Sequence, residues 1–182
     1  LESQAVVRSL ISNELKTKHG ILIIDLGSTT TNVIVYDYGA IRFTASLQQG
    51  VEQLMKGMDP EDIKRLMAHL HEIPKELAAK AHEHVLGSAD KLVRDVLGII
   101  EFYNSIDAKH VVKELLLVGG GSNLTGLDAV FLKYFTDVHV QRGNPWVNVL
   151  EGKADSKPPM DLQESVRYAT AIGLALRNTL PL

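Results

Sequence analysis

The chain has 182 residues, of which 45% are apolar and 23% charged, and this composition is ordinary for a globular protein and unlike that of a disordered one. Its formal net charge of −3 gives no electrostatic reason to expect binding to nucleic acid. It contains no cysteine, which excludes disulfides and thiol chemistry, and it has no apolar run of the roughly 18 residues that a membrane-spanning helix needs.

The first part of the chain is predicted to form a helix followed by three strands. Apolar residues at near-helical spacing predict a helix over 1–18, and because the chain starts inside it and without methionine, we expect a piece of a longer protein. The apolar run 21–24 predicts a buried strand, and the β-branched residues of 31–36 and the alternation over 41–47 predict two more. Tight turns between these strands indicate an antiparallel meander.

A mainly helical section follows and is predicted to form a subdomain at about 51–108. Asp59 is a suitable N-cap and Pro60 a suitable first-turn residue for one of its helices. Apolar residues recur at helical spacing almost without interruption over 75–103. This pattern predicts one long helix that packs on the sheet.

The last part of the chain is predicted to alternate strands and helices. The expected elements are a strand over 114–118, a helix over 124–135, a strand over 138–140 and a final helix over 162–178. Residues 147–160 contain Gly, Lys, Asp, Ser and a Pro pair, which indicates a surface loop. In the final helix, Ala169 and Gly173 stand four residues apart and would permit close contact with a neighbouring backbone.

The order of these elements indicates an α/β fold. A three-stranded antiparallel meander, a helical insertion and then βα units follow the plan of the ribonuclease H-like sheet. Two such lobes facing each other make the actin fold, and the sequence contains one. We therefore expect residues 1–182 to form a single lobe.

The turn after the first strand carries candidate phosphate-binding residues. These are Asp25, Gly27, Ser28, Thr29 and Thr30. A turn of glycine and small hydroxyl residues can direct backbone N–H groups at phosphate oxygens, and an aspartate at the strand end can hold Mg²⁺ through water. The alternative is an ordinary turn in which the aspartate caps backbone amides.

A second glycine loop follows the strand over 114–118. It consists of Gly119, Gly120, Gly121, Ser122 and Asn123. Glycines between a strand and a helix allow close approach of a base or phosphate, and a helix N-terminus favours anions. The dinucleotide fingerprint would need glycine where Leu124 stands, and no lysine of the P-loop kind follows. The two loops together predict a site at one edge of the sheet.

These motifs resemble those of a known superfamily. Asp25-Leu26-Gly27-x-x-x-Thr31 is similar to the second phosphate motif of the actin and FtsA superfamily, Gly119 to Ser122 to its adenosine motif, and 167–175 to its hinge segment. Further matches resemble the PilM family of type IV pilus and competence machinery: 43–50, Glu101-Phe102-Tyr103, Asn144-Pro145-Trp146 and 171–177. The resemblance covers nearly the whole chain, with the motifs in the family's order.

This resemblance implies that the chain is the second, C-terminal lobe of an actin-like protein. ATP with Mg²⁺ would lie between two lobes, with residues 27–30 near the terminal phosphates, 119–123 around the adenosine and Asp25 on the metal through water. It also implies that Glu61 and Lys64 contact the ribose and adenine, whereas the alternative is a surface ion pair one helical turn apart. Because the other lobe is missing, we expect this chain alone to bind nucleotide weakly.

The resemblance further implies a place and partners. PilM-like proteins are cytoplasmic, reach the inner membrane through partners, and serve twitching motility and competence. An N-terminal segment of the membrane protein PilN docks mainly on the lobe that is missing here, and other inner-membrane pilus assembly proteins are expected partners; self-association is left open. The family is better described as nucleotide-binding scaffolds than as efficient ATPases, so we assign no catalytic residue.

Three other functions are alternatives for such a sequence. A small-molecule kinase of the same superfamily needs a catalytic aspartate, and Asp37 and Asp90 stand in no pattern that suggests a base. A metal enzyme is not favoured, because the histidine pairs 69/71 and 82/84 have a spacing of two rather than four, and we expect them to face solvent. An interaction module with a vestigial nucleotide site stays open.

Overall fold

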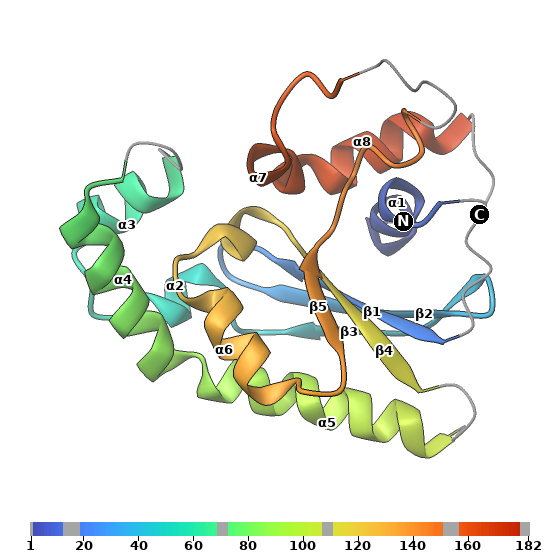
Figure 1. Ribbon diagram of the computed structural model, residues 1–182, viewed down its shortest axis with the longest axis horizontal. Coiled ribbons are helices and arrows are strands. Elements are labelled where there is room, and N and C mark those ends of the chain that lie inside the picture. The colour runs from blue at the N-terminus through green and yellow to red at the C-terminus, as the bar shows by residue number, and fades with distance from the viewer. Residues whose placement is uncertain (1, 13–18, 69–72, 107–110, 151–156, 179–182) are drawn as a thin grey trace.

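The computed structural model describes residues 2–12, 19–68, 73–106, 111–150 and 157–178 (Figure 1). One sheet runs through the centre, and helices cover both of its faces. Figure 1 shows α1 and α8 together on one side of the sheet and α5 and α6 on the other. None of the described helices is long and apolar enough to cross a membrane.

The sheet has five strands in the order β3-β2-β1-β4-β5. The strands are β1 (Gly20–Leu26), β2 (Thr31–Asp37), β3 (Ala40–Leu47), β4 (Val112–Val118) and β5 (His139–Arg142). The first three form an antiparallel meander, whereas β4 pairs parallel to β1 and β5 parallel to β4. This topology confirms the predicted ribonuclease H-like class, in which a meander is extended by βα units.

Strand β1 is apolar on both faces because each face meets its own layer of helices. Leu22, Ile24 and Leu26 pack into the core on the α5 side. Ile21 and Ile23 pack into a second core beneath α1. A strand at the centre of such a sheet is expected to be a continuous apolar run, and this is why the sequence identified it.

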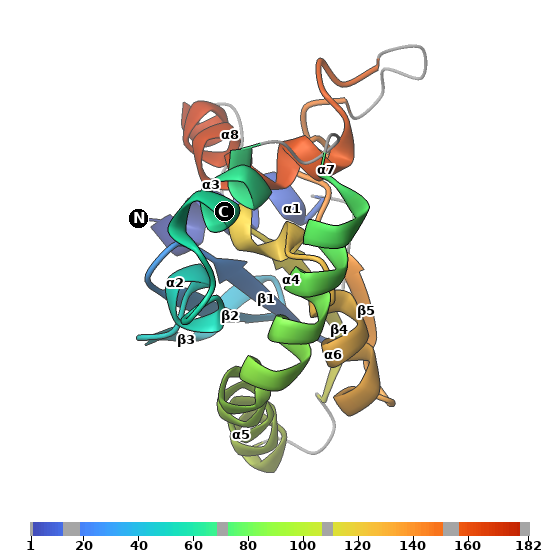
Figure 2. The ribbon, with the colours of Figure 1, turned by 90° about the vertical axis from the view of Figure 1, so that its left-hand side faces the viewer.

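The helical insertion packs on one face of the sheet. It contains α2 (Val51–Leu54), α3 (Pro60–Ala68), α4 (Lys75–Ser88) and α5 (Asp90–Ile106). The prediction of one long helix over 75–103 is wrong, because the chain turns between Ser88 and Asp90. The Ser88 hydroxyl donates a hydrogen bond to the Leu54 carbonyl oxygen (2.6 Å), which ties the end of α4 to α2. Figure 2 shows α4 leading away from α5 toward α3.

The opposite face is covered by α1 (Glu2–Leu10) and the C-terminal helices. The predicted first helix ends earlier than expected, at Leu10, and residues 13–18 lie outside the described part. The predicted final helix is interrupted: α7 (Leu162–Ser165), the 3-10 turn η2 (Val166–Tyr168), α8 (Ala169–Ala175) and the 3-10 turn η3 (Leu176–Asn178) follow one another. The tighter turn of η2 lies where the Val166 carbonyl oxygen accepts a hydrogen bond from the Gly119 N–H (3.0 Å).

Helices α1 and α8 approach each other closely at Gly173. A Cβ atom added there would lie 1.7 Å from the carbonyl oxygen of Ala5, so only glycine fits. Ala5 is fully buried and Ala169 is 2% exposed. The prediction that the small residues of this helix allow close backbone contact is confirmed.

Candidate functional site

The two glycine loops lie next to each other at one edge of the sheet. Strands β1 and β4 are parallel neighbours, with Asp25 paired to Val118. The loops that follow these two strands therefore leave the sheet at the same edge. Gly119 has a φ of +82°, and a Cβ on it would lie 2.4 Å from Asp25 Oδ1 and 2.6 Å from the Leu26 carbonyl oxygen. Glycine is therefore required at 119 by this contact between the two loops, and the structure brings the predicted residues of both loops together.

The turn over 27–30 has its carbonyl oxygens directed inward. The carbonyls of Gly27 and Ser28 accept hydrogen bonds from the first N–H groups of α2, at Val51 (3.0 Å) and Glu52 (2.9 Å). The N–H groups of Ser28, Thr29 and Thr30 donate no hydrogen bond to any residue that the structure describes. Backbone N–H groups that donate no hydrogen bond within the described part of an exposed turn are suited to bind an anion such as phosphate.

Contacts with the start of α2 and with Gln49 hold this turn in place. The first helix turn of α2 sits against it at Gly50, where a Cβ would lie 2.4 Å from the Ser28 carbonyl oxygen. Thr31 is fully buried, and its hydroxyl donates to the Gln49 carbonyl oxygen (2.5 Å). The Gln49 side chain in turn donates to Asp95 Oδ2 (2.5 Å). Thr31 thus anchors the turn and does not face a ligand.

Asp25 is a carboxylate held in a poorly solvated position. Burial, and then the negative charge of Glu2, raise the pKa of Asp25 from 3.8 to about 6. Its carboxylate receives no hydrogen bond from the residues that the structure describes. A carboxylate that has lost water without gaining a donor is destabilised, and a bound cation with its water shell would relieve this.

The second loop offers one glycine to the outside. Its residues Gly120 to Asn123 form the 3-10 turn η1. A Cβ on Gly121 would lie 2.6 Å from Leu26 Cγ, so this glycine is packed against the core. At Gly120 the nearest atoms to such a Cβ are Met67 Cε (3.5 Å) and Arg167 Nε (3.8 Å), so this position faces two long side chains rather than the core.

The polar side chains of this loop are used inside the protein. The Ser122 hydroxyl donates to the Gly119 carbonyl oxygen (2.7 Å), and Ser122 is fully buried. The Asn123 side chain donates to the Gln163 carbonyl oxygen (2.6 Å) and is 7% exposed. Both side chains therefore stabilise the loop and its contact with α7.

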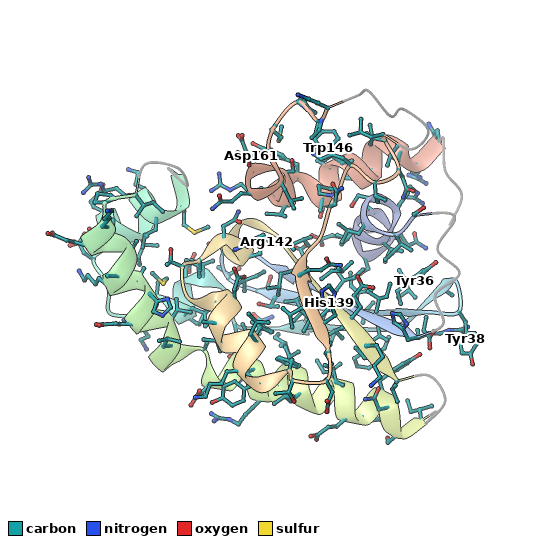
Figure 3. The ribbon with its side chains drawn as sticks, in the orientation of Figure 1. Tyr36, Tyr38, His139, Arg142, Trp146 and Asp161 are labelled. Atoms are coloured by element: carbon teal, nitrogen blue, oxygen red, sulfur yellow. The ribbon has the colours of Figure 1, made fainter. Side chains whose placement is uncertain are left out.

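Arg142 also holds the loop, and no motif in the sequence points to it. It ends β5 and is labelled in Figure 3. Its guanidinium donates to Asn123 Oδ1 (3.3 Å) and to the Ser122 carbonyl oxygen (3.4 Å), and forms an ion pair with Asp128 (2.9 Å). A strand-end arginine is common on protein surfaces, so only the folded arrangement identifies its role.

The predicted helix start at residue 124 is wrong. Helix α6 (Leu127–Tyr134) begins three residues later, because Gly126 adopts a left-handed conformation with φ +95°. A 3-10 turn, and no α-helix N-terminus, therefore stands behind the second loop. Gly126 packs against His82, where a Cβ would lie 2.9 Å from Nδ1.

The expectation of solvent-facing histidines is wrong for His82 and His84. His82 and His84 are half-buried, and His84 Nε2 is buried without a hydrogen-bond partner in the described part of the chain. His69 and His71 lie outside the described residues. Within the described ranges there is no group of three His, Asp or Glu residues that could hold a metal ion.

Glu61 and Lys64 lie on the exposed side of α3. Their side chains are 77% and 75% exposed, and Lys64 Nζ lies 3.9 Å from Glu61 Oε1. The helix is capped as predicted, because the Glu61 N–H donates to Asp59 Oδ1 (2.8 Å). Met67, one turn after Lys64, reaches Gly120, so α3 approaches the second loop.

The two aspartates considered as kinase bases, Asp37 and Asp90, lie away from the glycine loops. Asp37 ends β2 away from the loops, is fully buried and accepts a hydrogen bond from the Tyr103 hydroxyl (2.9 Å). Asp90 begins α5 and accepts one from the Tyr134 hydroxyl (3.2 Å). A cavity of about 290 Å³ lies between α5, the start of β4 and the end of α6, and neither glycine loop lines it.

The sheet order and the placing of two loops at one edge define a lobe of the actin-like ATPase fold. The family model for the type IV pilus assembly protein PilM matches residues 2–179. The chain belongs to this family. No curated protein matches the chain.

Solved structures support the same fold. A PilM–PilN type IV pilus biogenesis complex matches with a TM-score of 0.70 and 19% identity, over 100% of this chain and 52% of that one. Ethanolamine utilization protein EutJ from Carboxydothermus hydrogenoformans matches with a TM-score of 0.63 and 19% identity, over 96% and 53%. MreB 5 of Spiroplasma citri bound to AMPPNP matches with a TM-score of 0.61 and 12% identity, over 98% and 58%. The chain thus spans about half the length of the structures that it resembles.

Proposed function

We propose that this chain is the nucleotide-binding C-terminal lobe of a PilM-family scaffold protein in type IV pilus assembly. In this proposal residues 1–182 form one lobe with a mainly helical subdomain at about 51–108, and a second lobe completes the site. Support comes from the PilM match over residues 2–179 and from the 52% of the solved PilM chain that this chain covers.

The state of Asp25 carries the proposal. A poorly solvated carboxylate without a hydrogen-bond donor in the described structure is costly to keep, and it stands beside a turn with open N–H groups. Mg²⁺ held through water at Asp25, with the phosphates of ATP on the turn, would use both features. The ligand-contacting residues proposed are Asp25, Gly27, Ser28, Thr29, Thr30, Glu61, Lys64 and Gly120. Four further residues, Gly119, Gly121, Ser122 and Asn123, contribute by holding the loop in place.

The proposed partners follow from the family. The similar solved structure is a complex of PilM with PilN, and we propose that the full-length protein likewise binds an N-terminal segment of PilN, mainly through its other lobe. Contacts with further inner-membrane pilus proteins would keep it in the cytoplasm at the membrane surface and connect it to twitching motility or competence. The proposal includes no catalytic residue in this lobe.

Titration of the full-length protein with Mg-ATP tests the site. Asp25→Asn is expected to weaken Mg-ATP binding at least tenfold and to abolish its dependence on Mg²⁺, because the amide cannot replace the carboxylate. Asp137→Asn is the matched control, since Asp137 is exposed and lies before β5, at the other end of the sheet. Residues 1–182 alone are expected to bind weakly.

Equal binding by the wild type and both variants would contradict a working site at Asp25. The loops would then be a relic, and the lobe would be an interaction module. Tight binding of Mg-ATP by residues 1–182 alone would contradict the requirement for a second lobe.

A further inference from the structure

The side chains of Met67 and Arg167 meet over the outer side of Gly120. Met67 belongs to the helical insertion, and Arg167 lies in η2, 100 residues further along the chain. The Arg167 guanidinium donates a hydrogen bond to the Met67 carbonyl oxygen. Both side chains come within 4 Å of a Cβ placed on Gly120, at 3.5 Å for Met67 Cε and 3.8 Å for Arg167 Nε. The pair therefore covers the one glycine of the second loop that is not packed against the core.

This contact is of a kind that can open. Met67 and Arg167 are both half-buried, so water can take over the hydrogen bond of the guanidinium when the contact breaks. A long arginine side chain also regains rotamer freedom when it is released. The backbone of η2, in contrast, is fixed to the loop by the bond between Gly119 N–H and the Val166 carbonyl oxygen (3.0 Å).

We propose that the Arg167–Met67 contact is a closed gate over the base-binding end of the nucleotide site. A base can lie against Gly120 only after the Arg167 side chain has left the Met67 carbonyl. This inference rests on the proposed function. The turn over 27–30 lies on the Asp25 side of the site and has its N–H groups open, so phosphates alone do not have to displace Arg167.

Binding of two ligands to the full-length protein tests the gate. Arg167→Met removes the guanidinium and keeps a side chain of similar length. Arg65→Met is the matched control, because Arg65 is an exposed arginine on the same helix as Met67 and its loss changes the net charge equally. Mg-ATP carries a base, whereas Mg-tripolyphosphate does not.

The Arg167→Met variant is expected to bind Mg-ATP roughly tenfold more tightly than the Arg65→Met variant, which corresponds to ~1.4 kcal/mol. The affinities of the two variants for Mg-tripolyphosphate should agree within about twofold, because phosphates do not use the gate. Equal Mg-ATP affinities would overturn the gate. Weaker Mg-ATP binding by Arg167→Met would overturn it too, since Arg167 would then be a ligand contact.

Methyl NMR of Met67 provides a readout that needs no affinity change. The chain has four methionines and each of the two variants adds a fifth, so a ¹³C-methyl label gives few signals from it. Met67→Leu made in the same variant background assigns the signal of interest. Without ligand, the chemical shift of the Met67 methyl should differ between the Arg167→Met variant and the Arg65→Met control. In the control, addition of Mg-ATP should change this chemical shift, whereas addition of Mg-tripolyphosphate should not. The signal of Met55, which is fully buried, is the internal reference.

The two proposals fail in different ways. If neither variant binds Mg-ATP or Mg-tripolyphosphate, the nucleotide site itself is refuted. If both variants bind Mg-ATP while the Met67 signal stays in place, the site stands and the gate is refuted.

Discussion

Replacing Gly173 with alanine should separate α1 from α8. The added Cβ would lie 1.7 Å from the Ala5 carbonyl oxygen and 2.4 Å from its carbonyl carbon. An ordinary contact needs about 3.4 Å or more, so the two helices must move apart by roughly 1.5 Å or the backbone must bend. The obstacle is backbone and cannot rotate away. Overpacking of this kind costs about 1–3 kcal/mol, and the absence of a flexible neighbour places Gly173→Ala at about 3 kcal/mol, even after the better helix propensity of alanine.

Urea unfolding of residues 1–182 measures this effect. With a slope of about 2 kcal/mol/M, the midpoint of Gly173→Ala should fall by roughly 1.5 M. Gly98→Ala is the matched control, because Gly98 lies inside α5 with no atom within 4 Å of an added Cβ. It should raise the free energy of unfolding by about 0.5–1 kcal/mol. A Gly173→Ala protein as stable as the wild type would refute the close approach of the two helices.

Two further predictions concern the first loop. Folding raises the pKa of Asp25 from 3.8 to about 6, so between these pH values the folded protein binds more protons than the unfolded chain. Above pH 6 the ionised carboxylate therefore lowers the free energy of unfolding. This loss of stability is recovered as the pH falls toward 3.8. Asp25→Asn should therefore be more stable than the wild type by about 2–3 kcal/mol at pH 8 and show no such advantage at pH 4, as judged by urea midpoints. Thr31→Val keeps the shape of the buried side chain but leaves the Gln49 carbonyl oxygen without its donor. It should cost about 1–3 kcal/mol in the same assay, and an unchanged midpoint would show that the turn is not anchored there.

The strands could be predicted because their signals are local. The continuous apolar run of β1 and the β-branched residues of β2 reflect burial on both faces of the sheet. This signal does not depend on which helices cover those faces. The break between α4 and α5 could not be predicted in this way. The apolar periodicity continues through it, and the contact that ties Ser88 at this turn is a hydrogen bond to the Leu54 carbonyl oxygen, 34 residues away.

The candidate site also has a part that local sequence signals predict and a part that they do not. The glycines and Asp25 could be predicted because a strand end followed by glycine is visible in the sequence. Gly119 and Gly121 are glycine for packing reasons, however, and within the second loop only Gly120 faces side chains that can move aside for a ligand. The contacts of Arg142 with Asn123 and of Arg167 with Met67 could not be predicted, because these partners are distant in the sequence and come close only in the folded chain.

The contact between α1 and α8 at Gly173 is linked to both glycine loops. The charge of Glu2 on α1 acts on Asp25, while the Val166 carbonyl oxygen, just before α8, holds the N–H of Gly119. The Gly173 contact fixes α1 and α8 relative to each other, so it also fixes the two loops relative to each other. A shift of roughly 1.5 Å between these helices, as expected for Gly173→Ala, should therefore weaken nucleotide binding even under conditions in which the variant is fully folded.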